Sequence, residues 1–375
     1  KIKDFFKRAD IFLLAVCIIS TIFGIVMIYS MTSSYGWAKY VVVQGFAMFL
    51  GIGAFVVFTV IDPDLIADKW VYLTIFNVLF IVGLIFFGKG DEVGSRAWYR
   101  FAGIGVQPSE IVKVIFIVLI AKQMATYKEQ RTLNKFPSVL KLGIHWALYF
   151  GLITVIPNDL GSALIFLAIF VVMLICAGIA WYWMAAAAAV VAAMIPLFWN
   201  FFLADYQKNR ILAPYIPDVV DPTGQGITWQ MNLCKDALAS GRWTGVGFGE
   251  GSFSQSSYNA RHTDCVFASI GEELGMVACI AIIVLLSIII IRCCVIGVRS
   301  GSPFGMLICF GVATALAFQT FINIGMCIGI TPVIGITLPF FSYGGSSIVA
   351  MYAAVGLVSG VKYRPKPRQH FLQYQ

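Results

Sequence analysis

The sequence predicts an all-α, polytopic membrane protein with about ten transmembrane helices. Of its 375 residues 60% are hydrophobic and only 12% are charged, and the mean hydropathy is +0.88. A soluble domain of this length carries about 25% charged residues, so the composition excludes that class of protein. Ten apolar runs approach or reach the length of about 20 residues that a membrane-spanning helix needs. We therefore expect a single integral membrane domain over residues 1–375.

Short polar segments separate the ten expected spans, except between the seventh and the eighth, where a long polar insertion lies. Pro157-Asn158-Asp159 separates the fifth span from the sixth and predicts a tight turn. The alanines at 185–189 predict a close packing face, because small residues let membrane helices approach each other. The spans are residues 11–31, 39–61, 70–87, 106–126, 141–157, 160–178, 182–203, 265–291, 304–327 and 341–361.

The basic residues predict the orientation of the chain. With the N-terminus in the cytoplasm, 16 of the 26 basic residues fall on that same side, as the positive-inside rule requires. We therefore expect both termini to be cytoplasmic. We interpret the net charge of +8 as a topology signal and not as a nucleic-acid-binding surface. The nine cysteines lack zinc-finger spacing, and several lie inside apolar runs, where cysteine acts as a small hydrophobic residue.

A long polar insertion at residues 204–264 separates the seventh span from the eighth. We expect it to form a large extracytoplasmic loop. A connection of this length is too long for a simple link, and long loops in compact proteins are usually functional. Gly245–Gly251 has Gly-x-Gly spacing but follows no predicted strand, and the chain has no phosphate-binding P-loop. The sequence therefore predicts no nucleotide cofactor.

Charged residues near the outer membrane edge are the first candidates for chemistry. Trp98 and Arg100 lie in the loop before the fourth span, where an interfacial anchor is the alternative interpretation. Glu110 and Lys113 are three residues apart on one face of that span, so we expect an ion pair. Such a pair is either purely structural or lines a wet cavity.

Asp159, Arg210 and Asp264 are expected on the same side of the membrane. Asp159 begins the sixth span and Asp264 the eighth, so each carboxylate is either a helix cap or a functional group. Glu272-Glu273 is either part of the same site or only an outward-facing pair. We place Asp264 at the centre of the site.

The run Thr331–Ser347 before the last span contains two prolines and three glycines. Broken helix at membrane depth is tolerated only where protein or a wet cavity surrounds it. We therefore expect either a re-entrant segment beside a polar cavity, with Ser342 as a binding residue, or a kinked packing element.

Together, the outer mouth would hold carboxylates at positions 110, 159 and 264 and cations at 100, 113 and 210. This combination suits an anionic amphiphile with its polar head outside and its tail in lipid. The residues alone do not distinguish a protein that moves such a lipid from one that reacts it.

Three groups of motifs resemble the SEDS (shape, elongation, division and sporulation) family, the RodA/FtsW-type peptidoglycan glycosyltransferases of bacteria. The resemblance covers nearly the whole chain. Departures at Cys265, at Asn158 and in Ala239–Arg242 concern the local shape of the outer loop and leave the candidate residues intact. The motifs are Gln107-Pro108-Ser109-Glu110 with Lys113, His262-Thr263-Asp264 with Ile270-Gly271-Glu272-Glu273, and Asn323-Ile324-Gly325-Met326 with Leu338-Pro339-Phe340 and Ser342–Ser347.

The resemblance implies an enzyme that polymerises lipid II into glycan strands at the outer face of the bacterial cytoplasmic (inner) membrane, for wall synthesis in elongation, division or sporulation. It matches Asp264 to the family's essential aspartate. We add Arg100 and Ser342 as substrate-binding candidates from their positions. The other functional positions that the resemblance implies are Trp98, Glu110, Lys113, Asp159 and Arg210.

Glycosyl transfer needs a base for the attacking hydroxyl and stabilisation of the departing diphosphate. Asp264 would be the general base, and basic side chains or a divalent cation, Mg or Mn, would stabilise the diphosphate. The implied partners are lipid II, the growing glycan strand, a class B penicillin-binding protein (a transpeptidase) and other cell-wall machinery. Two alternatives stay open: a lipid II flippase and a non-catalytic scaffold.

Overall fold

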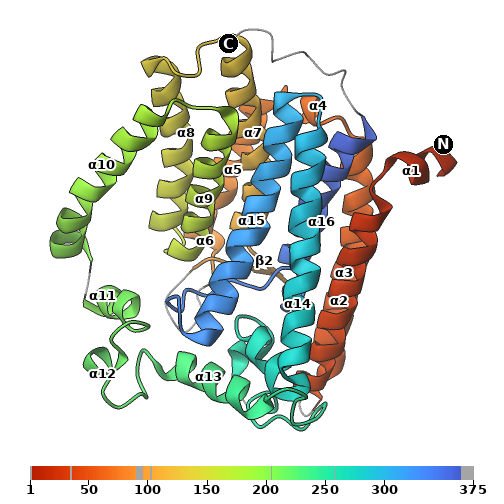
Figure 1. Ribbon diagram of the computed structural model, residues 1–375, viewed down its shortest axis with the longest axis vertical. Helices are drawn as coiled ribbons and strands as arrows, with labels where there is room; N and C mark the ends of the chain where they lie inside the picture. Colours follow the sequence, from red (N-terminus) through yellow and green to blue (C-terminus); the bar gives the residue numbers. More distant parts are fainter. Residues whose placement is uncertain are drawn as a thin grey trace.

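The computed structural model of the chain describes residues 2–33, 36–89, 96–101, 104–203, 205–256 and 258–364. In these ranges nine helices are long and apolar enough to cross a membrane, and all but one of them form a bundle along the long axis of the molecule (Figure 1). They are α2 (Ile11–Thr32), α3 (Trp37–Val60), α5 with α6 (Trp70–Val82, Leu84–Phe87), α8 (Phe136–Val155), α9 (Leu160–Ala177), α10 with η1 (Trp181–Leu197, Phe198–Phe202), α14 (Val266–Arg299), α15 (Pro303–Ile328) and α16 (Gly345–Tyr363).

The fourth expected span is α7 (Pro108–Glu129), which has the length of a span but is not one of the nine. Charge excludes it, because every 18-residue stretch of α7 contains at least three charged residues. Its position explains how it tolerates them. The helix lies inside the bundle against α9, α15 and α16, and Glu110 and Lys113 are both buried. Within the described residues the expected ten spans are therefore nine apolar helices and one charged helix, α7, which is buried in the bundle.

The last helix, α16, lies at the centre of the bundle and packs against α3 along its length. Two glycines allow this close approach. A side chain at Gly51 would come within 2.8 Å of the Tyr352 ring, and one at Gly356 within 2.8 Å of the Phe55 backbone. Small residues at helix contacts are the usual means of close packing in membranes, so the α3–α16 contact is fixed by local sequence.

The tight turn expected between the fifth and sixth spans is confirmed. Helix α8 ends at Val155, α9 begins at Leu160, and Asn158 between them adopts a left-handed conformation with φ of 55°. The packing face expected at alanines 185–189 is wrong, because α10 has no buried residue and stands apart from the bundle in Figure 1. Small residues permit a close contact, but they do not supply a partner.

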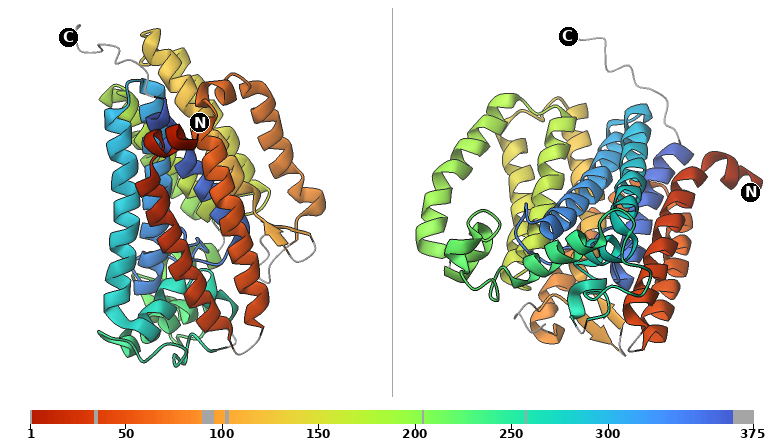
Figure 2. Two further views of the ribbon diagram at one scale, coloured as in Figure 1. Left: turned by 90° about the vertical axis from the view of Figure 1, so that its right-hand side faces the viewer. Right: turned by 60° about the horizontal axis from the view of Figure 1, so that its bottom comes forward.

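The two ends of the bundle differ. We call one the terminal end, because it carries both ends of the described chain with α1 (Ile2–Arg8) and α4 (Pro63–Ala67). The opposite end is the loop end, where the polar insertion folds (Figure 2). Lys1, Lys366 and Arg368, three of the basic residues used for the expected orientation, lie outside the described residues. The loop end carries α11 (Asp205–Leu212), α12 (Pro217–Val220), α13 (Trp229–Gly241) and the 3-10 helix η2 (Asn259–His262).

Two features at the loop end depart from regular helix. A short antiparallel hairpin of β1 (Tyr99–Phe101) and β2 (Ile104–Val106) precedes α7, and the sequence did not predict it. Residues 329–344, which we call the irregular segment, join α15 to α16 without helix. Gly335 and Phe340 are left-handed there, with φ of 68° and 66°. The last expected span accordingly begins at Gly345 and not at residue 341.

Candidate active site

Asp264 lies in the turn that joins η2 to α14. Its residue is half-buried. The N-cap of α14 is the next residue, Cys265, whose side chain makes no capping hydrogen bond. The interpretation of Asp264 as the N-cap of α14 is therefore wrong.

The irregular segment holds this turn in place. The Asn323 side-chain amide on α15 donates to the Asp264 carbonyl and to the Ile336 carbonyl, each at 2.7 Å. The Ser342 hydroxyl donates to the Thr263 carbonyl at 2.6 Å. All these contacts use the backbone of the turn, so the side chain of Asp264 is positioned without being consumed as a structural acceptor by Asn323 or Ser342.

A cation and a backbone glycine lie beside the Asp264 carboxylate. A Cβ atom at Gly335 would lie 3.5 Å from its Oδ2, so the carboxylate approaches the irregular segment closely. Burial lowers the pKa of the half-buried Arg210, and the Asp264 charge acts against this by favouring the guanidinium cation. Burial also raises the pKa of Tyr258, and the Asp264 charge acts in the same direction. Asp264, Arg210 and Tyr258 therefore form one electrostatic group.

Asp159 belongs to a second cluster. It is the N-cap of α9, so the interpretation of Asp159 as a helix cap is confirmed. Its Oδ1 accepts from the Ser162 backbone amide at 2.9 Å. Its other oxygen accepts from the Ser162 hydroxyl at 2.6 Å and from the Gln107 amide at 3.1 Å. Burial raises the pKa of Asp159 although these hydrogen bonds oppose the rise. The carboxylate is thus partly buried and structurally used, and its role toward a substrate stays a prediction.

The expected ion pair between Glu110 and Lys113 is confirmed. Lys113 Nζ lies 2.9 Å from Glu110 Oε2, and each side chain is only 6% exposed. Gln319 on α15 donates to Glu110 Oε1 at 3.4 Å, and Ser347 on α16 donates to Glu110 Oε2 at 3.3 Å. Buried charges at membrane depth need such partners. The pair therefore joins α7, α15 and α16 inside the bundle.

The irregular segment lies between the two clusters. On one side it meets the Asp264 turn through Ile336 and Ser342. On the other side Thr337 Oγ1 lies 3.5 Å from Ser347 Oγ, which is bonded to Glu110. A Cβ at Gly161 would come within 2.8 Å of the Ile334 carbonyl, so the start of α9 also packs against the segment. One stretch of non-helical backbone thus connects the carboxylates at 110, 159 and 264.

Trp98 and Arg100 lie on the hairpin side of the loop end. The Trp98 ring is partly buried, and a Cβ at Gly105 would lie 3.1 Å from it, whereas Arg100 is exposed. Gln107, directly after β2, donates its backbone amide to the Ser346 hydroxyl at 3.1 Å and its side chain to Asp159. The hairpin is therefore connected to the Asp159 cluster through Gln107, a residue whose part the sequence did not indicate.

Glu272 and Glu273 are not an outward-facing pair, since they are 1% and 0% exposed. Glu272 accepts from the backbone amides of Phe253 and Ser254. Glu273 accepts from the Gly249 amide and from the hydroxyls of Ser30 and Ser254. These carboxylates fix the glycine-rich part of the polar insertion against α14 and α2, which is a structural role.

The residues fit a divalent cation only in part. Among the described residues no three His, Cys, Asp or Glu side chains are close enough to hold a metal ion. Asp264 provides a single carboxylate beside Arg210. Mg²⁺ in proteins usually takes one or two carboxylates together with substrate phosphates. A cation here would need the diphosphate of the substrate as a co-ligand, and it stays a prediction.

The sequence matches the protein family FTSW_RODA_SPOVE, described as "Cell cycle protein", over residues 10–366. The chain belongs to this SEDS family. It is 31% identical over 372 residues to the "Probable peptidoglycan glycosyltransferase FtsW" of Geobacter metallireducens, with 96% of each chain covered. It is 32% identical over 318 residues to the peptidoglycan glycosyltransferase MrdB of Escherichia coli K12, covering 83% of this chain and 82% of MrdB. The expected family and enzyme class, peptidoglycan glycosyltransferase, are confirmed.

Solved structures of SEDS proteins share the fold. A chain in the structure "Structural coordination of polymerization and crosslinking by a peptidoglycan synthase complex" superposes with a TM-score of 0.79 at 25% identity, covering 94% of this chain and 97% of that chain. The rod shape-determining protein RodA of Thermus thermophilus superposes with a TM-score of 0.69 at 22% identity, covering 94% and 96%. The all-helical membrane fold expected from the sequence is therefore confirmed.

Proposed function

We propose that this SEDS protein polymerises lipid II into glycan strands, with Asp264 as the general base. The single observation that carries the proposal is the placement of Asp264: a half-buried carboxylate next to Arg210, on a turn whose backbone is fixed by Asn323 and Ser342. A general base must be held within hydrogen-bond reach of the proton that it takes. A carboxylate on a turn whose backbone is fixed by two hydrogen-bond donors meets that need.

The proposed step is one displacement at the anomeric carbon of the donor sugar. The acceptor hydroxyl oxygen forms the new glycosidic bond while its proton passes to an Asp264 carboxylate oxygen. The bond between the anomeric carbon and the diphosphate oxygen breaks, and the lipid diphosphate leaves with the electron pair. The Arg210 cation beside Asp264 would stabilise the negative charge that develops there. Inversion of the α-linked donor gives a β-linked product without a covalent enzyme intermediate.

The second cluster would hold the donor and the site together. Ser347, which donates to Glu110, lies 3.5 Å from Thr337 of the irregular segment. Asp159 begins the helix that packs against the same segment at Gly161. We propose that these residues act mainly by fixing the segment, and that Trp98 and Arg100 face the saccharide or diphosphate from the loop end. Ser342, expected as a binding residue, is 3% exposed and its hydroxyl is bonded to Thr263 and Leu338, so we assign it to positioning of the turn. An anionic lipid with its head at the loop end and its tail in the bilayer suits this arrangement.

The orientation and the partner are part of the same proposal. We propose that the loop end faces the extracytoplasmic side and that both termini are cytoplasmic, as the basic residues predict. The related chain in the peptidoglycan synthase complex supports a class B penicillin-binding protein as the partner. Exposed apolar side chains on α3 and α5, such as Phe49 and Tyr72, provide membrane-facing area for such a contact.

The test is polymerisation by the purified full chain in proteoliposomes that contain lipid II and no other glycosyltransferase. Glycan polymer that disappears after muramidase digestion is the expected result. Movement of labelled lipid II between leaflets without polymer would instead support a flippase. Neither polymer nor movement, from protein that binds its transpeptidase partner, would support a scaffold.

A further inference from the structure

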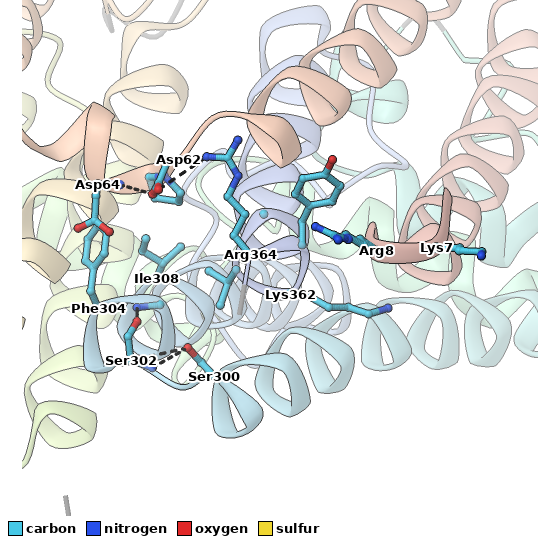
Figure 3. Close-up of a pocket in the computed structure, with 15 residues that line it drawn as sticks. Lys7, Arg8, Asp62, Asp64, Ser300, Ser302, Phe304, Ile308, Lys362 and Arg364 are labelled. Carbon is cyan, nitrogen blue, oxygen red and sulfur yellow. Dashed lines mark hydrogen bonds and ion pairs between the residues drawn. The ribbon is translucent and has the colours of Figure 1, made fainter. Parts of the chain in front are cut away.

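A cavity of about 780 Å³ lies at the terminal end, opposite Asp264 (Figure 3). It is open on one side and is lined by α1, by the turn from α3 into α4, by the start of α15 and by the end of α16. These are the points where helices reach the membrane surface. The charged residues that line the cavity are Lys7, Arg8, Asp62, Asp64, Lys362 and Arg364.

The two carboxylates of the cavity already have partners. Asp64 Oδ1 lies 2.8 Å from Lys122 Nζ. Asp62 caps α4 by accepting from the Asp64 amide, and its Oδ2 lies 3.7 Å from Arg364. Figure 3 shows these acidic side chains on one side of the cavity and Lys7, Arg8 and Lys362 on the other. The basic side therefore receives no charge compensation from Asp62 or Asp64.

The basic side has fewer anions than cations. Lys362 shares the single buried carboxylate of Asp10 with Arg292, at 3.1 and 2.8 Å. Lys7 and Arg8 on α1 are exposed, and neither forms an ion pair with the described residues. Among the side chains that the structure describes, two cations share one carboxylate and two have none, so positive charge is in excess on this side of the cavity.

An apolar surface adjoins the same side. Helix α1 projects from the bundle at the terminal end (Figures 1 and 2) and is fixed by the Phe5 ring against Tyr363, with centroids 6.1 Å apart. Phe6 is 62% exposed, and Phe12 at the start of α2 is 55% exposed beneath the Arg292 guanidinium. A short helix with basic and aromatic residues at the end of a span is typical of the membrane interface.

We propose that this cavity binds the phosphate group of an anionic membrane lipid, with Lys7, Arg8 and Lys362 as its cationic ligands and the acyl chains beside Phe6 and Phe12. The excess of cations favours an anionic ligand, and the phosphate is the anion that a lipid presents at the membrane surface. The adjoining phenylalanines favour a lipid over a soluble phosphate, since a soluble anion gains nothing from them. Basic side chains near an anionic membrane surface each add to such binding. This inference does not depend on the proposed polymerase reaction.

The test measures lipid binding to the full chain in detergent by native mass spectrometry and by the shift in melting temperature. The probes are phosphatidylglycerol, phosphatidylcholine with the same acyl chains, and inorganic phosphate. We expect phosphatidylglycerol to bind most tightly, and the double variant Lys7→Gln, Arg8→Gln to weaken it about tenfold to thirtyfold. The matched control is Lys135→Gln, Lys141→Gln, which removes the same charge from exposed lysines at the start of α8, outside the cavity.

Three outcomes would overturn the proposal. Equal weakening in the control variant would mean that only net charge matters. Equal binding of phosphatidylglycerol and phosphatidylcholine would remove the anion from the interaction. Inorganic phosphate that competes fully with the lipid at similar concentration, with the same loss in the Lys7, Arg8 variant, would assign the cavity to a soluble phosphate compound.

Discussion

Asp264 and the pair Glu272–Glu273 lie near the start of the same helix, yet their surroundings differ. Glu272 and Glu273 are almost completely buried and accept hydrogen bonds from amides and hydroxyls of the polar insertion and of α2. Asp264 is half-buried, lies beside Arg210, and is held through its backbone carbonyl by Asn323. The glutamates therefore hold the loop, whereas the aspartate is held by the structure around it.

This difference separates a structural carboxylate from a reactive one. A carboxylate that satisfies several buried donors cannot change its charge without leaving those donors unpaired, which is costly. The turn that carries Asp264 keeps its backbone hydrogen bonds from Asn323 and Ser342 whichever charge the Asp264 carboxylate carries. The same contrast predicts opposite consequences when the two kinds of carboxylate are neutralised.

The largest effect is expected for Asp264→Asn. The substitution keeps the shape and leaves the Asp264 carbonyl bonded to Asn323, so the melting temperature should stay near that of the wild type. Polymerisation should fall by about two to four orders of magnitude, because the general base is lost. The measurement is the initial rate of glycan synthesis at saturating lipid II, together with the melting curve. Asp236→Asn, an exposed carboxylate on α13, is the matched control and should retain full activity.

A near-normal rate in folded Asp264→Asn protein would remove the base from Asp264. The contrast with Glu272–Glu273 would then describe burial alone, and Asp159 and Glu110 would be the next carboxylates to neutralise. A loss of activity that follows a loss of stability would instead give Asp264 a structural role.

The Glu110–Lys113 pair provides a third kind of carboxylate, one matched by a cation. Lys113→Met should destabilise the protein by about 3–5 kcal/mol, because it leaves Glu110 charged and buried without its cation. The double variant Glu110→Gln, Lys113→Met should recover much of this loss, since no uncompensated charge remains. Yield and melting temperature in one detergent measure the effect. Equal losses in the single and double variants would contradict a stabilising ion pair.

Glu273→Gln is expected to have a smaller effect, and on stability instead of activity, whereas Asp264→Asn should lower activity and leave stability unchanged. The new amide group has one acceptor oxygen fewer for the Gly249 amide and the Ser30 and Ser254 hydroxyls. Hydrogen bonds to a charged group contribute about 1.5–3 kcal/mol, so the melting temperature should fall while activity per folded molecule is kept. Glu250→Gln, exposed in the same loop, is the control. A rate that falls without loss of stability would show that Glu273 acts in the reaction.

Much of the fold follows from the sequence because the bilayer imposes a length and a polarity on each span. The tight turn at Asn158 and the charged helix α7 could be predicted from residue types at single positions. The hairpin before α7 could not, since each strand has only three residues and no alternating pattern. Nor could the separation of α10, because the alanines at 185–189 describe one surface and contain no information about a partner.

The candidate site was predictable where spacing determines contact. Glu110 and Lys113 meet because residues three apart share a helix face, and Asp159 caps α9 because aspartate favours that position. The contact of Asn323 with the carbonyls of Asp264 and Ile336 joins residues distant in the chain, so no local pattern indicates it.

The smallest expected effect concerns His262, two residues before Asp264. It tests whether water reaches the His262 ring in the folded protein. Its ring is 5% exposed and packs edge-on against Tyr40 and Tyr343. Burial, helped by the charge of Arg261, lowers the pKa of His262 from 6.5 to about 4. The unfolded chain then binds more protons than the folded one between these values. The stability due to neutral His262 is therefore complete above pH 6.5 and declines as the pH falls toward 4.

Between pH 8 and pH 5.5 this linkage corresponds to about 1.4 kcal/mol of unfolding free energy. The variant His262→Phe keeps the aromatic contacts with Tyr40 and Tyr343 and removes the titrating group, so its melting temperature should decline less over the same range. The measurement is the difference between the two pH profiles, which cancels the titration of every other group. Parallel profiles would mean that water reaches His262 in the folded protein. The Asp264 turn would then be wet on both sides, and a base there would be weaker than a partly desolvated carboxylate.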